Sequence, residues 1–318
     1  MGTLLPCAPP VSTRLQSRWG WLLLVFPLIG VGELQAHLTQ RAAAVTAVDY
    51  ARARTEAGPL GPDDTIVFAP RWADPVGREA FPAVFGHDLL RAAPAELSRF
   101  EHVLEIASHG ATEPELAAWP VQWEKTVGKL TLRMHENRDF SKVVDPLTNR
   151  VGTDRLIVSQ GGKDCPLQRG SATAQSWGPA TPAARYACAA GAVGQVVVPD
   201  LSYRLRYCLF TPASPTPIRL RFVDVPFGSL VRVAYGLHTD DERSLSGAPV
   251  TLRALVQTEA AGGGVEDVEL GRIEHHDGEG WRTSDVPTPK LVGQTGDLHL
   301  EVSSTGGRRP FCFEAFAR

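Results

Sequence analysis

The densest group of residues able to bind or react lies near the end of the chain, from His275 to Arg282. Its sequence is His-His-Asp-Gly-Glu-Gly-Trp-Arg, which combines imidazoles, carboxylates, a guanidinium and an indole. Imidazoles and carboxylates are common metal ligands, but adjacent residues of a strand point to opposite faces and converge only at a bulge. We therefore predict a solvated turn rather than a metal site at residues 275–277.

Trp281 has two interpretations. Exposed in a loop, its flat apolar face would stack on a sugar ring, with Asp277, Glu279 or Arg282 bonding the hydroxyl groups. Buried, it would pack in a core, and its indole N–H would need an acceptor. We favour the core, because large aromatic residues beside a final strand pair usually pack the interior. These four residues are nevertheless the candidate ligand site.

Signatures of known catalytic classes are missing from the sequence, including the serine nucleophile elbow, the phosphate loop, the dinucleotide fingerprint and the zinc-protease motif. The segment 161–164 lacks the glycine spacing of a phosphate loop and reads as a surface turn. The segment 239–242 offers oxygen ligands of the kind that calcium takes, but we predict an acidic hairpin there. We expect no catalytic residue and no cofactor.

A second group of charged residues follows a predicted strand in the N-terminal half. Ligands bind at the carboxyl ends of parallel strands in α/β units, so a site is one interpretation there. Ordinary pairing on helix surfaces is the favoured one. The residues are Asp74, Arg78, His87, Asp88 and Arg91, with Ser108 and His109 after a second strand.

The last third of the chain alternates apolar and polar residues with period two. Successive side chains of a strand point to opposite faces, so this pattern predicts half-buried strands. The alternating segments are 203–207, 218–222, 231–233, 250–254, 268–270 and 298–302. Turn residues separate them, which favours an antiparallel β-sandwich, jelly-roll-like, over residues 121–318, with a Gly/Ala/Pro-rich loop at 160–192. We expect Phe311, Phe313 and Phe316 in its core.

The sequence pattern of residues 37–120 predicts a helix followed by a small α/β unit. Good helix formers fill 37–57, and the apolar runs 65–70 and 102–108 predict strands. Thr112 and Glu115 have the spacing of a capping box for a helix that would run to Trp119. The fold class is therefore α+β. The alternation of Leu130, Leu132 and Met134 suggests strands that belong to the sandwich.

An apolar segment at residues 19–38 follows two arginines near the N-terminus. Its uninterrupted part is shorter than the roughly 20 residues of a spanning helix. The segment has two main interpretations, a signal peptide and a membrane anchor, each within residues 1–36. A buried core helix is the third interpretation. The first two place the rest of the chain in the cell envelope.

The chain has five cysteines. Cys7 precedes the apolar segment, which leaves four. Of the three possible pairings, we favour Cys208 with Cys312, because the first and last strands of a jelly roll commonly lie side by side. Cys165 with Cys188 would then close a local loop. Reduced buried thiols are the alternative.

The net charge of −3 gives no electrostatic case for binding nucleic acid. The order of an apolar segment, an Arg/Ala-rich helix and the stretch from Asp64 to Arg78 resembles the extracytoplasmic C-terminal part of bacterial polytopic membrane glycosyltransferases related to protein mannosyltransferases. That resemblance implies an envelope location and a glycan context. It supplies no catalytic residue, because catalysis in that family lies in loops between membrane helices that this sequence lacks.

These observations predict a non-catalytic envelope protein whose sandwich binds carbohydrate or an envelope protein. An accessory subunit or remnant of a membrane glycosyltransferase is the alternative, and any enzymatic role would be associated with such a transferase.

Overall fold

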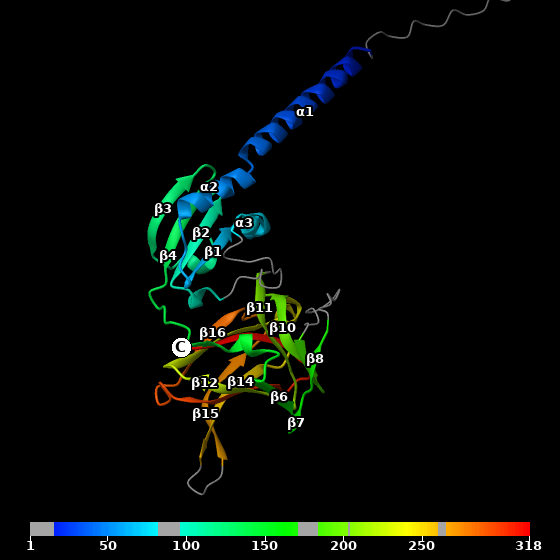
Figure 1. The fold of residues 1–318 in the computed structure, drawn as a ribbon. Coiled ribbons are helices and arrows are strands. Elements are labelled where there is room, and N and C mark those ends of the chain that lie inside the picture. The colour runs from blue at the N-terminus through cyan, green and yellow to red at the C-terminus, as the bar shows by residue number, and fades with distance from the viewer. Residues whose placement is uncertain (1–15, 82–95, 171–183, 203, 260–264) are drawn as a thin grey trace, which may run out of the picture.

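The computed structural model describes residues 16–81, 96–170, 184–202, 204–259 and 265–318. Figure 1 shows the chain as a projecting helix, a small α/β unit and a larger β-sandwich, arranged one after the other. The mixed architecture with a mostly antiparallel sandwich confirms the expected fold class at this level.

The N-terminal helix α1 spans Gln16–Ala43 and contains Pro27. None of the described helices combines the length and the apolar character needed to cross a membrane.

The predicted helix over residues 37–57 is interrupted. A new helix, α2 (Ala47–Ala57), begins after Thr46, whose backbone N–H and hydroxyl both donate to the Asp49 carboxylate at 2.8 Å. Such a cap supplies an acceptor to a free N–H at the start of a helix and so fixes where it begins. Tyr50 and Ala53 of α2 then pack on the sheet below.

Four strands form the sheet of the α/β unit in the order β1-β2-β4-β3, with β1 parallel to β2. The elements are β1 (Asp64–Ala69), η1 (Arg71–Ala73), α3 (Asp74–Ala80), η3 (Leu97–Arg99), β2 (His102–Ser108), η4 (Pro114–Leu116), β3 (Val121–Val127) and β4 (Leu130–Glu136). The expectation that Leu130, Leu132 and Met134 belong to the sandwich is therefore wrong. These residues face the core of the α/β unit, together with Phe68 and Ile106.

The capping box expected at Thr112 is also wrong. The Glu113 side chain accepts from the Glu115 backbone N–H at 3.5 Å, and Pro114 starts a single 3₁₀ turn rather than a helix to Trp119. This turn places Glu113 and Glu115 on the side of the unit that faces the sandwich.

Two sheets form the sandwich. One has the order β16-β13-β18-β11-β10-β9-β8, with β5 also paired to β18, and the other has the order β15-β14-β17-β12-β6-β7. The elements are β5 (Asp145–Pro146), η5 (Leu147–Arg150), β6 (Leu156–Gln160), β7 (Lys163–Asp164), β8 (Leu167–Arg169), β9 (Ala184–Cys188), β10 (Gly191–Pro199), β11 (Leu205–Ala213), β12 (Ile218–Pro226), β13 (Leu230–Leu237), α5 (Thr239–Ser244), β14 (Val250–Glu259), β15 (Val265–His275), β16 (Arg282–Pro287), β17 (Thr295–Ser304) and β18 (Arg309–Ala317).

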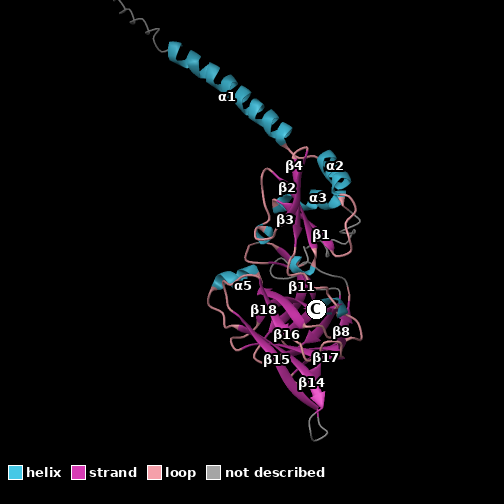
Figure 2. Cartoon of the chain, turned by 90° about the vertical axis from the view of Figure 1, so that its left-hand side faces the viewer, coloured by secondary structure: helices cyan, strands magenta, loops and turns pink. Residues whose placement is uncertain are grey.

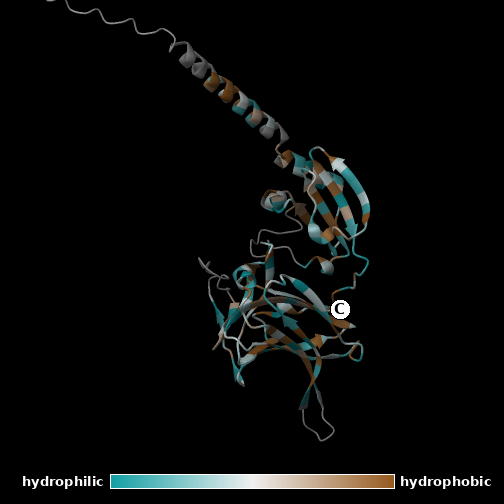
Figure 3. Cartoon of the chain, turned by 180° about the vertical axis from the view of Figure 1, so that it is seen from behind, coloured by the Kyte–Doolittle hydropathy of each residue, from teal (hydrophilic) through white to brown (hydrophobic). Residues whose placement is uncertain are grey.

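The alternation of the sequence is visible along the strands in Figure 3. On β18, Phe311 and Phe313 point into the core between the sheets, as predicted. Phe316 is fully buried but lies on the opposite face, where the guanidinium groups of Arg99 and Arg318 cover its ring at 5.2 and 5.9 Å from the centroid. The α/β unit therefore covers part of the outer face of this sheet. Figure 2 shows the unit at the end of the sandwich where β11 is labelled.

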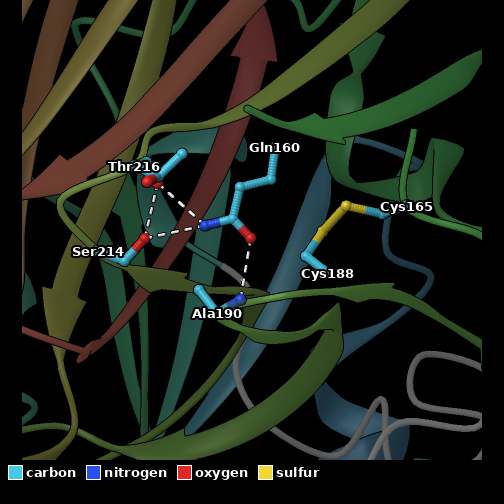
Figure 4. The surroundings of a disulfide bond; sticks show 6 residues. All are labelled: Gln160, Cys165, Cys188, Ala190, Ser214 and Thr216. Atoms are coloured by element: carbon cyan, nitrogen blue, oxygen red, sulfur yellow. Dashed lines mark hydrogen bonds between the residues drawn. A yellow bond between two sulfur atoms is a disulfide. The ribbon is translucent and has the colours of Figure 1, made fainter. Parts of the chain in front are cut away.

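Both expected disulfides form. Cys208 on β11 bonds Cys312 on β18, and these two strands are neighbours in one sheet. Cys165 bonds Cys188. Beside the second bond, the Gln160 amide donates to Ser214 and to the Thr216 carbonyl, each at 3.0 Å (Figure 4). Two disulfides suggest an oxidising, extracytoplasmic environment.

We predict that the two disulfides stabilise the fold unequally. Cys208 and Cys312 are 104 residues apart, whereas Cys165 and Cys188 are 23 apart. In the chain-entropy model the longer loop contributes about 5 kcal/mol and the shorter one about 3 kcal/mol. Urea unfolding of the two double alanine variants, Cys208→Ala/Cys312→Ala and Cys165→Ala/Cys188→Ala, should show the larger loss for the first pair. A larger loss for the second pair would contradict the prediction.

Candidate functional site

Two adjoining cavities lie where the α/β unit meets the sandwich. The first, of about 250 Å³, is lined by Ile66, Val67, Phe68, Arg71, Trp72, Asp74, Arg78, Glu113, Arg204 and Leu205. The second, of about 450 Å³, is lined by Arg71, Pro114, Glu115, Asp200, Leu201, Ser202, Arg206, Glu279, Gly280 and Trp281. Arg71 lines both cavities, and we refer to the two together as the junction groove.

The end of β1 explains why Arg71 and Trp72 lie at this surface. Pro70, joined to Ala69 by a cis bond, follows the strand directly, and η1 begins at the next residue. The chain leaves the sheet at once, which leaves Trp72 70% exposed. The Trp72 ring lies 6.1 Å from the ring of His109, which follows the neighbouring parallel strand β2. The carboxyl ends of β1 and β2 thus meet, as the sequence predicted.

Asp74 and Arg78, one turn apart on α3, form an ion pair of 2.5 Å at the first cavity. Burial raises the pKa of Asp74, while Arg78 acts in the opposite direction. The pairing expected on the helix is therefore present, and the paired residues also line a cavity. His87, Asp88 and Arg91 lie outside the described residues.

The sandwich contributes two buried arginines at the start of β11. The Asp200 carboxylate accepts from the backbone N–H groups of Ser202 and Arg204, each at 2.9 Å, and from Nε of Arg206 at 2.9 Å. An aspartate that bonds its own backbone two residues on fixes a turn. The turn directs both guanidinium groups toward carboxylates of the α/β unit. Figure 1 shows β11 at the end of the sandwich nearest to that unit.

Carboxylates of the α/β unit meet these arginines. Arg206 donates to Glu115 at 2.5 Å, and Arg204 pairs with the same carboxylate and with Glu113 at 3.6 Å. Arg71 donates to Glu113 at 3.2 Å. Burial alone would raise the pKa of Glu115, but the charges of Arg206 and Arg204 outweigh it and lower the pKa. Glu115 is therefore held ionised.

Trp281 lines the second cavity but is only half-exposed. Its indole N–H donates to Glu96 at 3.3 Å, and the Arg206 guanidinium lies 5.2 Å from its ring centroid. The ring also packs on a buried apolar cluster that includes the disulfide cysteines Cys208 and Cys312. Its surroundings match the packing interpretation more closely than an open stacking surface.

The other candidates near Trp281 separate into two groups. Glu279 lines the second cavity and accepts from the His276 backbone N–H at 3.0 Å. Asp277 points elsewhere, since it is buried against Arg309 and accepts from the Gly247 N–H at 2.7 Å. Arg282 is exposed, lies 3.6 Å from Glu279 and does not belong to the described lining of either cavity.

A buried hydrogen bond between two side chains positions this loop. Glu242 accepts from His275 at 2.7 Å, and both side chains are fully buried. The same carboxylate accepts from the backbone N–H groups of Gly278 at 2.9 Å and Gly280 at 3.3 Å. The acidic hairpin predicted at residues 239–242 is therefore wrong, because these residues form the start of α5, and His275 lies in the interior rather than in a solvated turn.

Most of the groove was not predicted from the sequence. Arg204 and Arg206 occupy the polar positions of an alternating strand, where solvent exposure is the ordinary expectation, yet their side chains are 3% and 5% exposed. The alternation alone does not reveal that another unit covers this face of the strand. Trp72 could have been identified from the sequence, because it lies two residues after Pro70, which ends the apolar run 65–70.

Neither the family models nor the curated proteins include a match to this chain. Among solved structures, the C-terminal family 22 carbohydrate-binding module of Clostridium thermocellum Xyn10B is 13% identical, with a TM-score of 0.28, over 54% of this chain and 88% of that chain. The CBM22-1 xylan-binding domain of Paenibacillus barcinonensis Xyn10C is 15% identical, with a TM-score of 0.26, over 46% and 90%. The cleaved K2 adhesin domain of Lys-gingipain is 11% identical, with a TM-score of 0.25, over 35% and 72%. Similarities this low carry no argument about the function of the groove.

We predict a pH effect from Glu314, which is buried on β18 against the α/β unit. It accepts from the Glu96 N–H at 3.2 Å and lies 3.8 Å from Arg99. Burial raises its pKa from 4.5 to about 7. The folded protein therefore holds this proton more tightly than the unfolded chain does. The contribution of this proton to the free energy of unfolding is complete below pH 4.5 and is lost as the pH rises through about 7.

Urea unfolding at pH 5 and pH 7.5 measures this effect as the change in the free energy of unfolding between the two values. Glu314 accounts for at most about 3 kcal/mol of the decline with rising pH. The Glu314→Gln variant should show a smaller decline than the unmodified protein. An equal decline in the two proteins would refute the role of Glu314.

Proposed function

We propose that this protein is a non-catalytic carbohydrate-binding protein of the cell envelope and that the junction groove is its binding site. The observation that carries the proposal is the exposed Trp72 ring beside a cavity whose walls present both guanidinium donors and carboxylate acceptors. Sugars offer a flat apolar ring face and hydroxyl groups that both donate and accept. The groove is complementary to both properties.

The aromatic contribution comes from Trp72 rather than from Trp281. Large aromatic rings contribute strongly to binding because they bury much apolar area with little loss of side-chain freedom. Trp72 is 70% exposed, whereas the Trp281 ring is already in contact with Arg206 and an apolar cluster. Within the groove, only the Trp72 ring among the described residues has this degree of exposure.

The polar contribution comes from charged side chains that are fixed but still reachable. Ion pairs hold them in place before a ligand arrives, which reduces the entropy lost on binding. Their side chains remain between 31% and 37% exposed: Asp74, Glu279, Glu115 and Arg71. Hydroxyl groups can therefore bond them without breaking the pairs.

The arginines keep the Glu115 pKa low, so this carboxyl group accepts hydrogen bonds and is a poor proton donor near neutral pH. The two disulfides support the envelope location. A role as an accessory subunit of a membrane glycosyltransferase is the second proposal, motivated by the resemblance of the stretch from Asp64 to Arg78. A glycan context is common to both proposals.

We predict that the Trp72→Ala variant binds any glycan that the unmodified protein binds with an affinity at least tenfold lower. Removal of this mostly exposed ring deletes the stacking surface, and a tenfold loss corresponds to about 1.4 kcal/mol. Leu245→Ala is the matched control, since Leu245 is 72% exposed at the end of α5 and belongs to neither described lining.

A glycan array probed with the purified protein, followed by titration calorimetry on the bound sugars, provides the measurement. Binding that survives Trp72→Ala unchanged would move the site away from the groove. Absence of binding to every glycan on the array would refute the carbohydrate proposal.

A further inference from the structure

The two cavities of the junction groove meet at one side chain. Arg71 donates to Glu113 of the α/β unit at 3.2 Å and to the Ser202 carbonyl of the sandwich at 3.4 Å. Because it lines both cavities, it marks the boundary between them. A ligand that extends from Trp72 past Arg71 therefore enters the second cavity and contacts both units of the protein.

The sizes of the cavities favour an extended ligand. Sites for drug-sized ligands have volumes of about 300–1,000 Å³. The cavity at Trp72, about 250 Å³, lies below this range, and the cavity at Glu279, about 450 Å³, lies in its lower half. One sugar ring on Trp72 would leave the larger cavity and its polar side chains unused.

The charges that a ligand can reach are mostly negative. Of the partly exposed charged side chains, Arg71 is positive, whereas Asp74, Glu115 and Glu279 are negative. The two linings together carry five carboxylates and four guanidinium groups, many of them paired with one another, so the groove offers no excess of positive charge to an acidic ligand. Like charges brought together at a binding site oppose association, so an acidic ligand is disfavoured.

We propose that the groove binds an uncharged oligosaccharide of at least two rings, with one ring on Trp72 and the next beside Glu279 in the second cavity. This inference rests on the proposed carbohydrate function and adds the length and charge of the ligand. Discrimination against acidic sugars comes from the lack of excess positive charge in the groove, and the preference for length comes from the two cavities that share Arg71 as a lining residue.

An array of defined oligosaccharides tests both properties with the full chain. It contains glucose, xylose, galactose and mannose, each with its β-linked oligomers of two to six units, and oligogalacturonates of the same lengths. We expect neutral oligomers of two or more units to bind at least ten times more tightly than the corresponding monosaccharide. Oligogalacturonates should bind more weakly than every neutral series that binds.

A single substitution separates the second cavity from the first. Glu279→Gln keeps the acceptor for the His276 N–H and removes the negative charge. It should weaken a neutral tetrasaccharide by about fivefold to tenfold, leave monosaccharide binding unchanged and improve oligogalacturonate binding. Glu266→Gln, at an exposed position of β15 outside both described linings, is the matched control.

The outcomes distinguish the two proposals. Monosaccharides that bind as tightly as their oligomers, or oligogalacturonates that bind best, would overturn the present inference and leave the carbohydrate function standing. A tetrasaccharide affinity unaffected by Glu279→Gln would overturn the placement of the second ring. Absence of binding throughout the array would overturn the carbohydrate function and the inference together.

Discussion

The arrangement of the whole protein depends on buried guanidinium groups at the junction between its two folded units. Charged groups removed from water must be paired, and pairing constrains geometry because each partner has to lie within hydrogen-bonding distance. Arg204 and Arg206 meet Glu113 and Glu115 under this constraint. Such pairs contribute orientation more than net stability, so their main effect is to fix how the α/β unit sits on the sandwich.

Two further contacts extend the junction along β18. Arg318 donates to the Ser98 carbonyl at 2.8 Å, and burial lowers its pKa to about 10. Glu314 accepts from the backbone of Glu96, whose own carboxylate accepts from Trp281. The indole therefore links the junction to the loop that carries Glu279. Trp281 positions a wall of the groove, which explains why it packs against the sandwich and yet lines a cavity.

The sequence allowed prediction of what depends on local periodicity. Alternation identified the strands around residues 218–222 and 298–302, and the strand order of a sandwich led to the pairing of Cys208 with Cys312. Alternation does not reveal which sheet a strand joins, and for that reason Leu130 and Leu132 were assigned to the sandwich. The same limit applies to Arg204 and Arg206, whose burial depends on a unit more than 60 residues earlier in the chain.

The candidate site was predicted in part for a related reason. Glu279 and Trp281 line the groove, but Asp277 and Arg282 do not, because proximity in sequence does not determine the direction of side chains around a tight turn. Two glycines with positive φ, Gly278 and Gly280, turn the chain between these residues. Trp72 and Arg71 come from a segment more than 200 residues away, which no local pattern near Trp281 indicates.

The most direct test of the junction groove is a crystal structure of the full chain soaked with a neutral β-linked tetrasaccharide. The account predicts sugar density against the exposed face of Trp72 that continues past Arg71 toward Glu279, with Arg204 and Arg206 still paired to Glu113 and Glu115. Density on a face of the sandwich remote from the α/β unit, with the groove empty, would contradict it.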